Sequence, residues 1–103
     1  MFEELTDRQI KASILEFLIK KGRWGNYYFP LETLVNWLSK KIRRDGKRVR
    51  KCLRDLVNEG YILIHKRGET ISLNPSRSME IKEFIDSWKT HLNVNDRNHK
   101  IVP

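Results

Sequence analysis

The fold is decided by residues 31–73, which read LETLVNWLSKKIRRDGKRVRKCLRDLVNEGYILIHKRGETISL. Apolar residues recur at helical intervals in the first part, and they predict a helix over residues 31–39 or slightly beyond. A second apolar series has the same period and predicts a helix over about 47–59, which Gly60 ends. Asp45 precedes this helix, where a carboxylate can accept hydrogen bonds from free amide groups. We therefore expect two helices joined by a tight turn.

The end of the same stretch changes from helical to strand character. Residues 61–64 and 70–73 are rich in aromatic and β-branched side chains. The segment between them contains Lys66, Arg67 and Gly68. This pattern predicts a two-stranded hairpin with a basic, glycine-containing tip.

The flanking sequence adds two more helices and a short strand. Thr6 and Gln9 form a capping box at the start of an amphipathic segment that Gly22 ends, which predicts a helix there. The aromatic run at 27–29 indicates a short strand, and residues 79–92 return to helical spacing. The fold class expected is α+β, mainly α with a small β-hairpin.

Positive charge is concentrated in one segment. The chain has 21 Lys and Arg residues against 13 Asp and Glu, a net charge of +8. Residues 40–54 contain nine of the basic residues and a single acid, Asp45, so the rest of the chain is balanced. A localised basic surface attracts a polyanion. Because the segment lacks the opposite charges at i+4 that usually accompany a merely solvated helix, we interpret it as a nucleic-acid-binding surface.

The order of elements over residues 6–75 resembles the winged helix-turn-helix superfamily. The chain is similar in particular to small archaeal and archaeal-virus regulators that have a trailing helix. The resemblance depends most on the apolar residues of the second helix and on the start of the hairpin, namely Val49, Cys52, Leu53, Leu56, Val57 and Glu59-Gly60-Tyr61-Ile62. It implies a three-helix core with a wing and an extra C-terminal helix.

This resemblance implies that helix 47–59 lies in the DNA major groove and that the hairpin follows the neighbouring backbone or minor groove. Clustered Lys and Arg side chains supply affinity because they neutralise phosphates and release the counterions of the DNA. Arginine can also pair with guanine edges. Where many such regulators have Ser or Thr, this chain has Arg43 to Lys47, which favours backbone affinity over base discrimination. The DNA-binding residues expected are Arg43, Arg44, Lys47, Arg48, Arg50, Lys51, Arg54, Lys66 and Arg67.

Within this set, we expect Lys47, Arg48, Lys51 and Arg54 at or near the groove. Arg44 and Arg50 are expected nearer to phosphates. The function expected is that of a double-stranded DNA-binding protein, a transcriptional regulator. Two alternatives remain open, namely a winged-helix module that meets an acidic protein partner in a larger complex, and an RNA or single-strand binder that adds Tyr27 and Tyr28 to the basic surface.

Residues that carry catalysis or bind metals are not arranged for either purpose. Cys52 falls among apolar positions, where cysteine is usually inert rather than a redox switch. The three histidines, His65, His91 and His99, lack metal-ligand spacing. The chain has no phosphate-binding glycine loop, nucleophile elbow or paired carboxylates. We therefore expect neither an enzyme nor a metal or cofactor, and the sequence indicates no small-molecule pocket.

The expected organisation is a winged-helix domain over 1–75, a C-terminal helix over 76–92 and a polar tail over 93–103. The C-terminal helix has apolar residues on two flanks, Phe84 on one and Ile81, Ile85, Trp88 and Leu92 on the other. This surface predicts a homodimer, and the alternative is that the helix packs on the first helix of its own chain. The sequence lacks a signal peptide or apolar span, and a single cysteine suits a reducing compartment, so a cytoplasmic location is expected.

Overall fold

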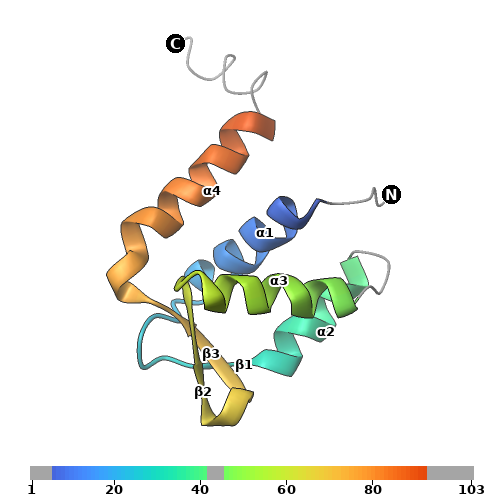
Figure 1. The fold of residues 1–103 in the computed structure, drawn as a ribbon, viewed down its shortest axis with the longest axis vertical. Coiled ribbons are helices and arrows are strands. Elements are labelled where there is room, and N and C mark those ends of the chain that lie inside the picture. The colour runs from blue at the N-terminus through green and yellow to red at the C-terminus, as the bar shows by residue number, and fades with distance from the viewer. Residues whose placement is uncertain (1–5, 42–45, 93–103) are drawn as a thin grey trace.

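Helices make up most of the computed structural model, which describes residues 6–41 and 46–92, with side chains through Ser87 (Figure 1). In chain order the elements are α1 (Asp7–Lys20), β1 (Phe29–Pro30), α2 (Leu31–Lys41), α3 (Gly46–Asn58), β2 (Ile62–His65), β3 (Thr70–Leu73) and α4 (Ser78–Leu92), with 3-10 turns at Lys66–Gly68 and Pro75–Arg77. The strands form one antiparallel sheet of order β1-β3-β2. The expected α+β class, mainly α with a small β-hairpin, is confirmed, and β1 extends the hairpin to a three-stranded sheet.

The capping box expected at the start of α1 is present. The Thr6 hydroxyl accepts a hydrogen bond from the Gln9 amide at 3.1 Å, and the Thr6 amide donates to the Gln9 side chain at 2.8 Å. These bonds satisfy two polar groups that a helix start leaves without partners. At the other end, Gly22 has a φ of +66°, the left-handed conformation that stops a helix cheaply only at glycine.

The hairpin forms where the sequence predicts it, and the first strand does not. Ile62 pairs with Leu73 and His65 with Thr70 in β2 and β3. The strand expected at 27–29 is instead Phe29–Pro30. The reason is that the Tyr27 amide bonds to the Trp24 carbonyl at 3.0 Å in a turn, so this residue is not available to the sheet.

The tip of the hairpin has an unusual backbone. Lys66 and Arg67 have φ values of 49° and 55°, and Gly68 follows with 93°. Glycine adopts positive φ freely, but for an ordinary residue the left-handed region costs roughly 1–2 kcal/mol. Next to the tip, the Glu69 carbonyl accepts a hydrogen bond from the Leu31 amide at 3.0 Å, which ties the hairpin to the start of α2.

One apolar core joins all of these elements. The predicted inner side of α3 is confirmed, because Val49, Cys52, Leu53 and Leu56 are each at most 3% exposed. They pack against α1, α2 and the sheet. The other buried core residues are Ile10, Ile14, Leu15, Leu18, Phe29, Leu34, Val35, Leu38, Ile62, Ile71, Leu73, Ile81 and Ile85.

The described part of α4 packs on its own chain. α1 lies between α3 and α4 (Figure 1), and Ile81 and Ile85 are buried in the same core. Arg8 of α1 covers the Phe84 ring at 5.3 Å and donates to the Ser87 hydroxyl at 3.1 Å. The apolar flank containing Ile81 and Ile85 is therefore used, at least in part, inside the monomer.

Several sequence expectations fall outside the described residues. They are the Asp45 cap, the packing of the Trp88 and Leu92 side chains and the polar tail over 93–103. Within the residues described, no helix combines the length and the apolar character that crossing a membrane requires.

Candidate nucleic-acid interface

The outer side of α3 presents a row of exposed polar side chains. Lys47, Lys51, Arg54 and Asn58 are exposed and follow one another at intervals of four, three and four residues. This spacing aligns them along one side of a helix, opposite the buried residues. We call these four residues the outward row. Arg43 and Arg44, also expected at the interface, lie outside the described residues.

Acidic residues line the edge of α3 that faces α1. Arg48 contacts Asp7 at 3.1 Å, and Lys51 contacts Asp7 at 3.3 Å and Asp55 at 3.2 Å. The expectation that this segment lacks opposite charges is therefore wrong. Asp55 is the i+4 partner of Lys51 and lies one residue beyond the basic segment, whereas Asp7 comes from the start of α1.

These contacts shift the ionisation of the groups that make them. Hydrogen bonding to Arg48, and then to Lys51, lowers the pKa of Asp7 below its ordinary value. The hydrogen bond from Lys51 likewise lowers the pKa of Asp55. Asp55 and Asp7 in turn raise the pKa of Lys51. All three groups are thus held in their charged forms at neutral pH.

The network continues onto α1 through Lys11. Its ammonium group lies 3.5 Å from Asp55 and 3.4 Å from Glu59, and its side chain is 17% exposed. Lys11 and Asp7 could not be assigned to this surface from the sequence, because both lie some forty residues from their partners in the chain. Together these ion pairs mark the α1 edge of the outward row.

On the opposite edge, Arg50 is held by α2. Its guanidinium donates two hydrogen bonds of 2.8 Å to the two carboxylate oxygens of Glu32. This bidentate contact lowers the pKa of Glu32 and raises that of Arg50. In contrast, Lys47 and Arg54 form no ion pair with any residue that the structure describes. Uncompensated charge on the described part of α3 is therefore centred on these two residues.

The hairpin tip supplies two more exposed cations, Lys66 and Arg67. The Lys66 ammonium lies 5.8 Å from the centre of the Tyr28 ring, which stacks on His65 at 4.0 Å. A cation over an aromatic ring is attracted to its electron-rich face. Lys66 is thus oriented by the Tyr28 ring, which belongs to the loop before β1.

The ring of His65 is fixed by the buried hydroxyl of Ser72. The hydroxyl donates to the Gly25 carbonyl at 2.7 Å, and it lies 3.0 Å from His65 Nε2. Because its one proton is already used, Ser72 accepts from His65 Nε2, which must carry a hydrogen. These two contacts join β3 to the loop before β1, and they fix the orientation of the His65 ring on which Tyr28 stacks.

The aromatic loop offers little free surface for stacking on unpaired bases. Trp24 is half-buried and packs against the core, and Tyr28 is stacked on His65. Tyr27 is 67% exposed. Among these three aromatic residues of the loop, Tyr27 is thus the one whose ring is largely exposed.

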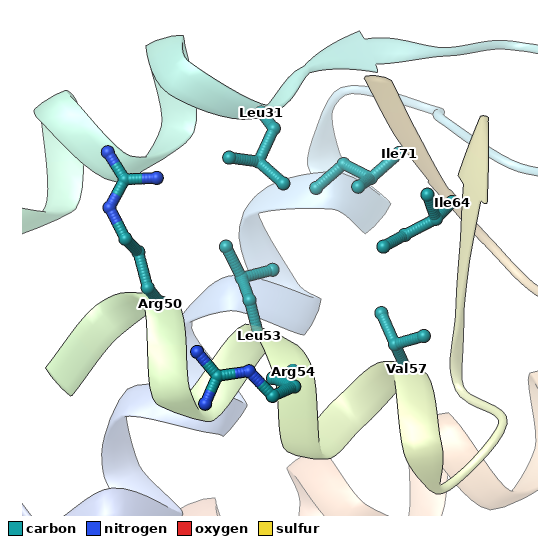
Figure 2. Close-up of a pocket in the computed structure, with 7 residues that line it drawn as sticks. All are labelled: Leu31, Arg50, Leu53, Arg54, Val57, Ile64 and Ile71. Atoms are coloured by element: carbon teal, nitrogen blue, oxygen red, sulfur yellow. The ribbon is translucent and has the colours of Figure 1, made fainter. Parts of the chain in front are cut away.

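A pocket that the sequence pattern does not predict separates α3 from the hairpin. Its volume is about 240 Å³, and Figure 2 shows the side chains around it. The lining residues come from the start of α2, from α3 and from both hairpin strands, namely Leu31, Arg50, Leu53, Arg54, Val57, Ile64 and Ile71. The pocket shows that the Arg54 side of α3 adjoins the hairpin.

Cys52 lies in the apolar core rather than at the surface. It is 0% exposed, and its Sγ lies 3.8 Å from the Asp7 carbonyl oxygen. Burial raises the pKa of the Cys52 thiol to about 11. Across the described ranges 6–41 and 46–92, the structure contains no group of three His, Cys, Asp or Glu side chains placed to hold a metal ion.

Comparisons with known protein families, with curated proteins and with solved structures give no match to this chain. A functional interpretation therefore depends on the geometry and charge described above. The most distinctive surface is the outward row of α3 beside the basic hairpin tip.

Proposed function

We propose that this chain is a winged-helix protein that binds double-stranded DNA and regulates transcription. α3 acts as the recognition helix in the major groove, and the β2-β3 hairpin acts as the wing. The observation that carries the proposal is the outward row of α3, where Lys47 and Arg54 have no acidic partner within the described residues. A helix that is buried on one side and cationic on the other is suited to a polyanion.

The dimensions and order of the elements support this proposal. A helix of 13 residues is about 20 Å long, and its width of roughly 10–12 Å suits a major groove about 12 Å wide. The order helix, strand, helix, helix, hairpin, helix agrees with the winged-helix expectation. The hairpin flanks α3 across the pocket, so both can approach one duplex.

The ion pairs divide the basic residues into two groups. Lys47 and Arg54 can contact DNA without leaving a described partner. Arg48, Arg50 and Lys51 must share or exchange their carboxylates for phosphates, and exposed pairs of this kind are worth only about 0–1 kcal/mol. We therefore propose Lys47 and Arg54 as the central contacts, with the other three, together with Lys66 and Arg67, reaching phosphates at the margins.

The test is a salt titration with a fluorescent duplex of about 25 base pairs, a little over two helical turns. We expect affinity to fall steeply with salt, with a log–log slope of about −0.9 for each phosphate contact. An unlabelled single strand of the same sequence serves as competitor, and we expect the duplex to bind more tightly.

Charge reversal locates the interface. We expect Arg54→Glu and Lys47→Glu each to weaken duplex binding about tenfold or more at low salt. Lys82→Glu is the matched control, because it makes the same change at an exposed position of α4, and it should alter affinity by less than about twofold. Circular dichroism confirms that each variant remains folded.

Two results would contradict the proposal. If the folded chain fails to bind duplex DNA even at low salt, α3 is better explained as a contact surface for an acidic protein partner. If the single strand outcompetes the duplex, and Tyr27→Ala weakens that binding, the surface serves RNA or single-stranded DNA instead.

We also propose that the protein acts as a homodimer through α4. The hairpin tip and the C-terminal end of α4 lie at opposite ends of the molecule (Figure 1), so contacts through α4 leave α3 free. Met79, on the first turn of α4, is 70% exposed. A two-fold dimer presents two recognition helices to half-sites one DNA turn apart and raises affinity by linked binding.

A further inference from the structure

The pocket between α3 and the hairpin combines an apolar interior with a cationic end. Five of its seven lining residues are aliphatic, and Ile64 is 46% exposed although it is a large apolar side chain. In Figure 2 the guanidinium groups of Arg50 and Arg54 are directed to one side of the view, and Val57, Ile64 and Ile71 lie on the other side. A ligand in this pocket therefore meets hydrocarbon at one end and guanidinium at the other.

The two arginines differ in what they offer to a ligand. Arg50 already holds the Glu32 carboxylate through two hydrogen bonds of 2.8 Å, which shows that the edge of the pocket accepts a carboxylate in a bidentate arrangement. Arg54 is exposed and has no ion pair with a described residue. Its guanidinium is therefore available to a second carboxylate beside the first.

The volume limits the size of the occupant. Pockets for drug-sized ligands measure roughly 300–1,000 Å³. This pocket, at about 240 Å³, is smaller. A single ring or a branched chain suits a space of this size.

We propose that this pocket binds a small apolar carboxylic acid, with its hydrocarbon body against Val57, Ile64 and Leu53 and its carboxylate on Arg54. The apolar walls remove the body from water, and the guanidinium selects the charge. The ligand class is an aryl or branched-chain monocarboxylate.

The ligand is expected to oppose duplex binding, and this second step depends on the proposed function. Arg54 belongs both to the pocket and to the outward row. A carboxylate on Arg54 neutralises one of the two α3 cations, Lys47 and Arg54, that lack an ion pair with a described residue, and it places a negative charge beside the proposed path of the DNA. The chain would then release DNA when the acid is abundant.

Binding is tested first without DNA, on the full chain, by NMR titration with 4-phenylbutyrate. We expect chemical-shift changes centred on the methyl groups of Val57 and Ile64. Two matched probes separate the contributions, because 4-phenylbutanol keeps the body without the charge and butyrate keeps the charge with little of the body. Both should bind at least about tenfold more weakly, the difference expected for a lost charged hydrogen bond or a lost apolar contact.

Variants of the chain test the same assignment. Arg54→Gln should weaken 4-phenylbutyrate about tenfold and leave 4-phenylbutanol unchanged. Lys47→Gln is the matched control, since it removes a cation of the same helix outside the pocket, and it should have less than about a twofold effect. Val57→Phe should block the pocket by filling it, and Ile64→Ser provides a second wall variant at a more exposed position.

The DNA arm adds 4-phenylbutyrate or an equal concentration of butyrate to the duplex complex, so that both samples have the same ionic strength. We expect 4-phenylbutyrate alone to displace the duplex, and Arg54→Gln to remove that difference. In the NMR titration, equal chemical-shift changes with 4-phenylbutyrate and 4-phenylbutanol, or changes at residues other than Val57 and Ile64, would overturn the inference while leaving DNA binding intact. Conversely, a chain that binds the acid but not the duplex would overturn the proposed function and leave the ligand site standing.

Discussion

Lys66 and Arg67 show how a surface residue can be placed at an energetic cost. Both are in the left-handed backbone region, with φ values of 49° and 55°, where glycine or asparagine would be less strained. The strain is accepted because the paired strands and the Leu31 to Glu69 hydrogen bond hold both ends of the turn. The result is two cations at the outermost point of the hairpin.

Replacing Arg67 by glycine should relieve this strain. Glycine removes a strain of roughly 1–2 kcal/mol from the folded state. Its greater conformational freedom in the unfolded chain destabilises the fold by roughly 0.5–1 kcal/mol. We expect Arg67→Gly to be about 0.5–1 kcal/mol more stable to urea unfolding than Arg67→Ala, which removes the same side chain and keeps the strain.

The two variants should bind duplex DNA equally weakly, because both lack the guanidinium. Equal stabilities would show that the tip is not strained in solution. A difference between their DNA affinities would show that the turn conformation, and not only the charge, contributes to binding.

Cys52 should be chemically inert in the folded protein. It is fully buried, and with its pKa raised to about 11 roughly one thiol in a thousand is ionised at pH 8. We expect a disulfide reagent such as 5,5′-dithiobis(2-nitrobenzoate) to react slowly with the native chain and rapidly in denaturing urea. Fast reaction under native conditions would contradict the burial of this residue.

At the scale of secondary-structure elements, ion pairs fasten α1 to α3. Asp7 contacts both Arg48 and Lys51, and Lys11 reaches Asp55 and Glu59. Each exposed pair contributes little alone, whereas the shared partners form a network along the contact between the two helices. The position of α3, and with it the direction of the outward row, is thus coupled to the charge state of Asp7.

This coupling predicts a dependence of stability on acid pH. The folded state lowers the pKa of Asp7 from its ordinary 3.8, so the carboxylate stabilises the fold above that value and loses its contribution as the pH falls through the lowered pKa. Asp7→Asn should be less stable than wild type at pH 7, and the two should converge near pH 2. Urea unfolding at several pH values measures the difference.

The matched control is Asp86→Asn, which removes an exposed carboxylate of α4 that forms no ion pair within the described residues. Its stability relative to wild type should change little over the same pH range. If Asp7→Asn behaves in the same way, the network does not hold α1 and α3 together in solution.

Local patterns could be predicted from the sequence, and contacts between distant segments could not. The Thr6 capping box, the buried side of α3 and the pairing of the hairpin depend on residues within a few positions of one another. The Asp7 and Glu32 ion pairs depend on how separate helices meet, so counting charges along 40–54 overestimated the free basic surface. Even Asp55, at i+4 from Lys51, was missed because the counted segment ended at Arg54.

The pocket was missed for a related reason. Leu31, Val57 and Ile64 each satisfy the apolar pattern of their own element, so nothing in the sequence distinguishes them from core residues. They line a hollow because α2, α3 and β2 do not close completely around them. Strand β1 was misplaced because its bounds depend on pairing with β3, where Phe29 pairs with Ile71 and Pro30 with Thr70, about forty residues further along the chain.

At the scale of the whole molecule, α4 determines the oligomeric state that we propose. Light scattering after size exclusion should give twice the chain mass of 12.4 kDa. Met79→Lys places a charge at an exposed apolar position of α4 and should shift the protein toward monomer. The single-chain mass at the concentrations used for DNA binding would contradict the dimer, and single half-sites would then be the expected target.

The contact between α1 and α4 also affects how the chain can fold during its synthesis. α1 is made first, yet Ile81 and Ile85 of α4 cover part of its apolar side. The core therefore remains incomplete until residue 85 has left the ribosome. Until then, part of the apolar side of α1 stays exposed while more than sixty further residues are synthesised. For this protein, nascent chains stalled before α4 are the ones that chaperones and proteases should recognise.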